Sequence, residues 1–243
     1  MENRRVALCD KEKALISLPR IAEAVGYEDT PVETALVKPN VCGMHHPELR
    51  LMRAVVQFLK PSCKALTIGE TDSTMHSPDE MFRRLGIYQL ASEFEVSVRD
   101  LTRGQESRVD IPKPHILKSL SLPRMVLECD RLVNVPGVGT HSGALLTCAL
   151  KNLLGLIPEP HKYSRFHPMG ISEVLADLSQ VVRPDLTVVD WGTRVVVGVD
   201  PLAIDVVVAR GLGMNPRDVK HLVLVAQDRG LDVDHLDVDL MEI

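Results

Sequence analysis

The sequence predicts an α/β fold in which helices cover both faces of a largely parallel, doubly wound sheet. Short apolar runs alternate with segments of helical periodicity along the chain, which is the pattern of βα units. Polar and turn-forming residues follow several of these runs, where the strands of such a sheet end. The chain has 243 residues, 45% of them hydrophobic, so it can bury a substantial core without disulfides. We therefore expect one α/β domain over residues 1–243.

Seven apolar runs are the expected strands. The run 34–37 should end at Lys38-Pro39-Asn40, because proline cannot donate to a ladder and holds the preceding residue extended. The run 131–135 is expected to be buried in the sheet. The expected strands cover residues 6–9, 34–37, 65–68, 94–98, 131–135, 186–189 and 194–199.

Segments with apolar residues at helical spacing are the expected helices. One follows Asp200-Pro201, where an N-cap acid precedes proline at the first helical position. This helix is apolar nearly all round and should be buried, so Asp205 within it must be neutral, paired or directed into a polar cavity. A salt bridge to Arg210 or Lys151 would also satisfy Asp205. The expected helices cover residues 11–25, 47–59, 77–85, 140–154, 170–181 and the stretch after residue 201.

Three stretches are expected to lack helices or long strands. Residues around 102–115 are charged and contain two prolines, which indicates an exposed excursion. Residues around 156–169 hold three prolines and two histidines, and we expect them to form a loop over the site. The alternating segment 232–239 indicates a solvated tail or an edge strand.

The run 134–155 has the organisation of a small-ligand site, with a strand end, a glycine-rich turn and the start of a helix. The turn 136–139 should carry the backbone beyond the strand. Thr140 or Ser142 can then cap a helix whose free N–H groups favour an anion.

One face of that helix carries Lys151 as its single charge, whereas a solvated face normally carries several. The face should therefore be covered, and Lys151 then needs a partner. The alternative is that Lys151 extends to water and Asn152 caps the helix end near Gly155.

Composition limits the classes of function. The formal charge is -5, and no lysine-rich run interleaved with aromatic residues is present, which argues against nucleic acid as the main partner. No apolar stretch approaches the roughly 18 residues of a membrane span, so we expect neither secretion nor membrane insertion. Five cysteines lie scattered without a C-x-x-C pair, which fits a reducing cytoplasm. The oligomeric state stays open.

Several motifs together resemble the family called domain of unknown function 362, over most of the chain. The motifs are Val37-Lys38-Pro39-Asn40, Asn134-Val-Pro136 with Thr140-His141, Lys151-Asn152-Leu-Leu-Gly155, His167-Pro168, and Asp200-Pro201-Leu-Ala203-Ile-Asp205 before Leu212-Gly213. Some members of that family carry ferredoxin-like iron–sulfur modules, which implies a link to redox chemistry or cofactor assembly. The family has no agreed activity to transfer.

The chain departs from this family in three places. The family usually has a lysine in the turn before the Thr-His pair, whereas here the turn is Gly137-Val-Gly139, so no phosphate role for that lysine carries over. A longer glycine-rich insertion common in the family is reduced here to residues 191–194, and one wall of the expected cleft is then in doubt. The clustered cysteines of a ferredoxin module are absent, which argues against an intrinsic iron–sulfur cluster of that type.

The first hypothesis is a strand-end cleft that binds a small anionic metabolite carrying carboxylate or phosphate. Turns also collect polar residues for backbone reasons, but four polar strand ends favour a real site. The sequence leaves open whether a reaction occurs there; His141, His167 and Lys151 are the candidate catalytic residues, because imidazole and amine groups can transfer protons. A lone histidine is also often structural. The candidate ligand-binding residues are Lys38, Asn40, Asn134, Thr140, Ser142, Asn152 and Asp205.

Two alternatives need other cofactors. In a metal-dependent version, Glu70, Asp72 and Asp190 would hold a divalent ion, since carboxylates are hard oxygen ligands, although acidic strand ends have other causes. In the second class the protein is an accessory in redox chemistry or in iron–sulfur or cofactor assembly. A cluster on Cys9, Cys42 and Cys148 would require the three thiolates to meet, while buried cysteine is commonly just a small apolar residue.

Overall fold

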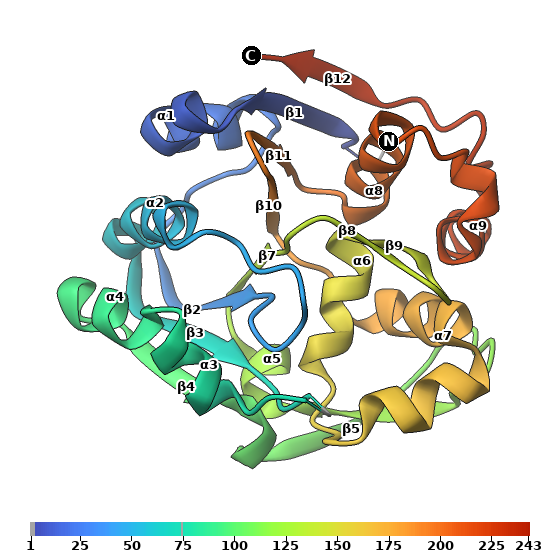
Figure 1. The fold of residues 1–243 in the computed structure, drawn as a ribbon, viewed down its shortest axis with the longest axis horizontal. Helices are drawn as coiled ribbons and strands as arrows, with labels where there is room; N and C mark the ends of the chain where they lie inside the picture. Colours follow the sequence, from blue (N-terminus) through green and yellow to red (C-terminus); the bar gives the residue numbers. More distant parts are fainter. Residues whose placement is uncertain (1–2, 74) are drawn as a thin grey trace.

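An eight-stranded sheet forms the centre of the protein, which we describe from a computed structural model for residues 3–73 and 75–243 (Figure 1). Five of its neighbouring strand pairs are parallel, and only β11 runs antiparallel to both of its neighbours. The predicted α/β class and the largely parallel sheet are confirmed. From edge to edge the strands are β12 (Asp239–Glu242), β1 (Arg5–Asp10), β11 (Arg194–Gly198), β10 (Leu186–Trp191), β7 (Arg131–Val135), β2 (Val32–Pro39), β3 (Cys63–Glu70) and β4 (Ser97–Asp100).

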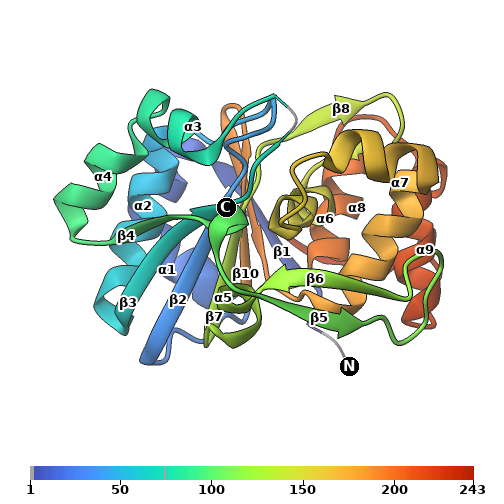
Figure 2. The same cartoon turned by 90° about the horizontal axis from the view of Figure 1, so that it is seen from below.

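Helices cover both faces of this sheet, as predicted, because successive strand residues point to opposite sides. Ala35 and Val37 of β2 join one apolar cluster with the first four helices, while Leu36 joins a cluster on the other face. Figure 2 shows the two helical layers on either side of the sheet. The first layer holds α1 (Lys11–Ala24), α2 (Leu49–Leu59), α3 (Pro78–Arg84) and α4 (Ile87–Phe94). The second holds α5 (Arg124–Glu128), α6 (Ala149–Asn152), α7 (Lys162–Val181), α8 (Pro201–Gly211) and α9 (Lys220–Asp228).

The order of connections makes a switch point between β2 and β7. The chain leaves β2 through α2 and enters β3 on one side, whereas it leaves β7 through α6 and α7 and enters β10 on the other side. The two strands pair in parallel, with Lys38 opposite Asn134. Such divergence leaves a crevice beyond the carboxyl ends of the two strands, where ligands bind in open α/β sheets.

The predicted helix over 140–154 is wrong in its first half. Residues Gly139–His141 (β8) and Leu145–Thr147 (β9) form a hairpin, and α6 begins only at Ala149. Helical spacing of leucines is compatible with this arrangement because a short apolar run is ambiguous between strand and helix. Asp205 decides the start of α6, since its carboxylate accepts hydrogen bonds from the backbone N–H groups of Ala149 and Leu150 at 2.7 and 3.0 Å.

Two stretches expected to be irregular contain regular structure. The excursion around 102–115 includes β5 (Glu106–Asp110), which pairs antiparallel with β6 (Ser119–Pro123). The loop expected around 156–169 ends early, because α7 begins at Lys162 and passes through Pro168 before a kink at Gly170, whose φ is 115°. Positive φ of this size is strained for any residue but glycine, so the helix breaks there rather than at the proline.

The remaining short elements are single-turn 3₁₀ helices, at Lys60–Ser62, Leu101–Arg103, Leu153–Leu156 and Pro216–Asp218. The end of the chain forms β12, an edge strand parallel to β1, which is one of the two forms expected for this region. Among the described residues, no helix has both the length and the apolar character that crossing a bilayer requires.

Candidate functional site

A cavity of about 480 Å³ lies at the switch point, beyond the carboxyl ends of β2 and β3. The end of β2 contributes Lys38 and Asn40, and the end of β3 contributes Glu70, Thr71 and Asp72. Its other walls come from the β8–β9 hairpin, from α6 and from the first turns of α7. Among its lining residues are Cys42, Met44, His45, Met75, Thr140, His141, Thr147, Lys151, Asn152, Gly155, Lys162, Tyr163 and His167.

A buried ion pair forms the floor of the cavity. The Lys38 ammonium lies 3.1 Å from Glu70 Oε2 and donates to Asn152 Oδ1 at 2.6 Å. Burial lowers the pKa of Lys38, and the charge of Glu70 opposes this effect. The Asn152 side chain then donates to Asn134 Oδ1 at 2.8 Å, and Asn134 donates to the carbonyl of Ala149 at 3.1 Å. This chain of bonds ties β2, β3, β7 and α6 together beneath the cavity.

Residues 153–161, which connect α6 to α7 and are called the strap below, are held against the end of β3 by a second lysine. Lys162 is buried and donates from its amine to Thr71 Oγ1 and, at 3.0 Å, to the carbonyl of Ile157. Thr71 Oγ1 donates in turn to the carbonyl of Gly155 at 2.7 Å. A side chain on Gly155 would collide with Lys38 and Glu70, so only glycine fits at this point. Burial lowers the pKa of Lys162 to about 8.

Lys151 differs from these two lysines, because its amine lines the cavity without a hydrogen-bond or ion-pair partner within the described part of the chain. Burial, followed by the nearby charge of Lys38, lowers the pKa of Lys151 to about 8. The protein itself supplies no partner among the described residues, but Lys151 is half-buried and its amine is not closed off from solvent, as in the alternative in which Lys151 extends to water. Of the two bonds suggested for Asp205, neither is made, since Asp205 caps α6 and is fully buried.

Asp72 is the acidic counterpart of Lys151 in the cavity wall. Its Oδ1 is buried and has no hydrogen-bond partner among the residues that the structure describes. Burial, followed by the charge of Asp100, raises the pKa of Asp72. This oxygen is closed off from solvent, so the raised pKa, which favours a proton on the carboxyl group, does not by itself point to a ligand.

The two candidate catalytic histidines form a pair, with 3.1 Å between their Nε2 atoms. His141 Nδ1 accepts from the backbone N–H groups of Gly143 and Ala144, so its proton must lie on Nε2. This Nε2–H donates a hydrogen bond to His167 Nε2, and His167 donates from its own Nδ1–H to the carbonyl of Tyr163. Burial, together with the charge of Lys151, lowers the pKa of His141 to about 4 and also lowers the pKa of His167. Both rings are therefore neutral near pH 7.

Other predicted residues lie outside the cavity. Ser142 is exposed in the turn of the β8–β9 hairpin and does not cap a helix. Asn134 is fully buried beneath the floor, where it supports Asn152. The first N–H groups of α6 are not left for the predicted ligand anion, because the carboxyl group of Asp205 accepts from the N–H groups of Ala149 and Leu150, and burial raises the pKa of this carboxyl group to about 7.

The residues named for a metal ion are divided between two places. Glu70 and Asp72 line the cavity, but Asp190 lies at a separate position, where it is 2.7 Å from the Lys11 ammonium and accepts from the backbone N–H of Glu48. Among the described residues, no three His, Cys, Asp or Glu side chains are grouped as metal ligands.

The three cysteines suggested for a cluster do not meet either. Cys9 packs with the first helical layer and donates to the carbonyl of Val195, whereas Cys148 packs on the opposite face of the sheet. Cys42 alone lines the cavity.

Sequence reasoning missed Lys162 and Thr71, whose hydrogen bonds to each other and to the backbone of Gly155 and Ile157 hold the strap against β3. Lys162 fell within the stretch expected to be a loop, where a lysine normally points to solvent. Its burial depends on the acceptors of Thr71 and Ile157, and no local pattern in the sequence shows those contacts.

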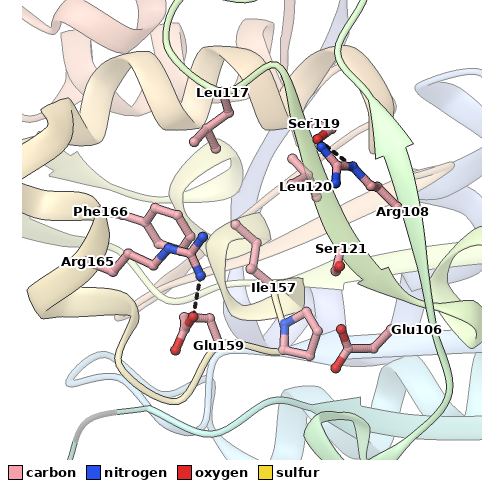
Figure 3. A pocket seen from close by; sticks show the side chains of 11 residues that line it. Glu106, Arg108, Leu117, Ser119, Leu120, Ser121, Ile157, Glu159, Arg165 and Phe166 are labelled. Carbon is pink, nitrogen blue, oxygen red and sulfur yellow. Dashed lines mark hydrogen bonds and ion pairs between the residues drawn. The ribbon is translucent and has the colours of Figure 1, made fainter.

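A second hollow of about 290 Å³ lies on the outer side of the strap, between the β5–β6 hairpin and the start of α7 (Figure 3). Arg165 pairs there with Glu159, and Arg108 donates to the neutral hydroxyl of Ser119 at 2.8 Å. Glu106 also lines this hollow.

Comparisons with known proteins give a family but no curated relative. Two solved structures are similar at low identity. One is a structural-genomics protein of Thermotoga maritima, which has a TM-score of 0.41 and 13% identity over 74% of this chain. The other is the lactate racemase apoprotein of Thermoanaerobacterium thermosaccharolyticum, which has a TM-score of 0.45 and 14% identity over 78% of this chain. The chain covers 50% and 52% of these two structures, about half of their length. No curated protein matches the sequence. The family profile matches residues 35–210, and the chain therefore belongs to the family Domain of unknown function (DUF362).

Proposed function

We propose that the cavity at the β2–β7 switch point binds a small anionic metabolite that carries a carboxylate or a phosphate. The unpartnered amine of Lys151 is the observation that carries this proposal. The Lys151 ammonium is half-buried and has no acceptor in the described part of the chain, and an anion in the cavity would supply one. Three lysines line the cavity against the two carboxylates of Glu70 and Asp72, so the balance of charge also favours an anion.

The test is a thermal-shift series with small carboxylates, their hydroxy and amino derivatives, and inorganic phosphate. At least one of these anions should raise the melting temperature of the native protein. Lys151→Ala should weaken its binding by about tenfold to a hundredfold, the loss expected for one charge-assisted hydrogen bond. The matched control is Lys64→Ala, since Lys64 is exposed and bound to Glu33 far from the cavity wall. Equal binding by both variants would contradict the proposal.

An accessory role in redox chemistry or cofactor assembly remains the alternative that family resemblance suggested. No contact in the structure favours it over anion binding, because Cys9 and Cys148 lie on opposite faces of the sheet.

A further inference from the structure

The three lysines of the cavity differ in the number of hydrogen bonds that they donate. Lys38 donates to Glu70 and Asn152, and Lys162 donates to Thr71 and to the backbone of Ile157. The amine of Lys151 donates to no group in the described part of the chain. An amine acts as a nucleophile only when its nitrogen lone pair is free, and of the three only Lys151 has no acceptor in the described part of the chain that fixes its nitrogen and favours its ammonium form.

The surroundings of Lys151 also favour its neutral form. Its side chain is half-buried in the cavity wall, and the positive charge of Lys38 lies nearby. Both effects disfavour a second ammonium, and they lower the pKa of Lys151 to about 8. A lysine desolvated next to another cation is a recognised form of activated nucleophile.

A hydrogen-bond donor of fixed orientation lines the same cavity. Two backbone N–H groups hold His141 in the tautomer that carries its proton on Nε2, and the charge of Lys151 acts on this ring. His141 Nε2–H donates to His167 Nε2 at 3.1 Å. The same N–H can therefore donate a hydrogen bond to an oxygen of a ligand bound in the cavity.

From these contacts we propose that Lys151 forms an imine with the carbonyl group of a small carboxylate such as a 2-oxo acid. The inference rests on the proposed function, because it places a carbonyl-bearing anion in the same cavity. The lone pair of the neutral Lys151 amine forms a bond to the carbonyl carbon, and the electron pair of the C=O π bond moves to oxygen, which accepts a hydrogen bond from His141 Nε2–H. That oxygen takes one proton from the nitrogen and one from solvent and leaves as water, while the nitrogen lone pair forms the C=N bond and the nitrogen keeps its second proton as a protonated imine. No oxidant or reductant is consumed.

The charge of the product explains why the carbonyl compound should also carry a carboxylate. A neutral Lys151 leaves the bound anion without a partner, but the protonated imine restores a positive charge on the same nitrogen. Its pairing with the carboxylate would stabilise the adduct in a site that excludes most water. A simple aldehyde lacks this partner and should form less adduct.

The experiment traps the imine on the full-length protein with glyoxylate and sodium cyanoborohydride at pH 7, followed by peptide mass spectrometry. The adduct should form on Lys151 at least about tenfold faster than on exposed Lys64, because a lowered pKa leaves more neutral amine. Acetaldehyde, which has no carboxylate, should modify Lys151 less than glyoxylate does. Modification of Lys151 no faster than Lys64 would overturn the inference.

A variant separates this inference from the proposed function. Lys151→Arg keeps the positive charge but has no nucleophilic amine, so it should lose the adduct at this position whatever its affinity for the anions of the thermal-shift series. Anion binding that depends on Lys151 but yields no trapped adduct would overturn the imine and leave the proposed function standing. Anion binding indifferent to Lys151→Ala would overturn both. Peptide mapping of the native protein decides the question even if Lys151→Arg fails to fold.

Discussion

At the scale of single residues, the site depends on which buried charges have partners. Lys38 and Glu70 neutralise each other in the floor of the cavity, where each is nearly inaccessible to solvent. Lys151 has no such partner among the described residues. The first two charges therefore hold the structure together, and the third remains available to a ligand.

Removing one member of the floor pair should destabilise the protein strongly. Glu70→Ala is expected to cost about 3–5 kcal/mol of the free energy of unfolding, because it leaves the Lys38 ammonium buried without a counter-charge. The double variant Lys38→Met with Glu70→Ala should recover part of that loss. Urea denaturation measures both, with Glu33→Ala at the exposed Lys64 pair as a control that should change little. A double variant less stable than Glu70→Ala would show that the pair is not a coupled unit.

At the scale of elements, α6 is placed by a contact with α8 rather than by its own sequence. Asp205 lies 56 residues from Ala149 and yet supplies the acceptor for the first N–H of the helix. The sequence around 140–154 carries a helical pattern, so local reasoning extended the helix into the β8–β9 hairpin. Most strands of the central sheet and α8 were predictable because apolar runs and the Asp200-Pro201 cap are local signals. The strand predicted at 94–98 was wrong in its bounds, because α4 extends to Phe94 and β4 begins only at Ser97. Contacts between distant segments, such as Lys162 with Thr71, leave no local signal.

Loss of the Asp205 carboxylate should detach the start of α6. Asp205→Ala leaves the buried N–H groups of Ala149 and Leu150 without acceptors, at an expected cost of about 1–3 kcal/mol each. Chemical denaturation measures this cost. Hydrogen exchange should show faster exchange of these two amides than in the native protein, whereas unchanged protection would contradict the role given to Asp205.

The helix α9 carries a buried histidine that should make the protein sensitive to acid. Neither ring nitrogen of His221 has a hydrogen-bond partner among the described residues, and burial lowers its pKa to about 3. The unfolded chain takes up a proton near pH 6.5 and the folded protein does not. Stability is therefore lost as the pH falls from about 6.5 toward 3, at up to about 1.4 kcal/mol per pH unit.

Replacing His221 should reduce this sensitivity. His221→Leu fills a similar volume without polar atoms, so its stability should vary less between pH 6.5 and 4, as measured by denaturation at each pH. His235→Gln, at an exposed position, should leave the pH profile unchanged. An identical profile for His221→Leu and the native protein would mean that other groups dominate.

At the scale of the whole molecule, the doubly wound topology creates the crevice, and the residues at the strand ends line it. The connections from β2 and β7 diverge, and the polar residues that follow β2 and β3 meet beyond the sheet. Sequence reasoning predicted this edge because polar strand ends can be read along the chain. It also placed Asp190 in the cavity, whereas in the structure Asp190 forms an ion pair with Lys11 and accepts from the backbone N–H of Glu48 in another part of that edge. Neighbouring strand ends share an edge of the sheet, but the partners that each side chain finds decide whether it reaches the cavity.

The central claim is that a small anion binds to the charged amine of Lys151, and the most direct test is calorimetric titration of the tightest-binding anion between pH 6.5 and 9.5. In the protein without ligand the pKa of Lys151 is about 8, so above that pH the amine must take up a proton when the anion binds. The affinity for the anion should therefore fall by up to about tenfold for each pH unit above 8. Lys151→Arg should remove this dependence, since arginine stays charged throughout the range. An affinity that is constant across the range in the native protein, or that falls equally in Lys151→Arg, would contradict the account.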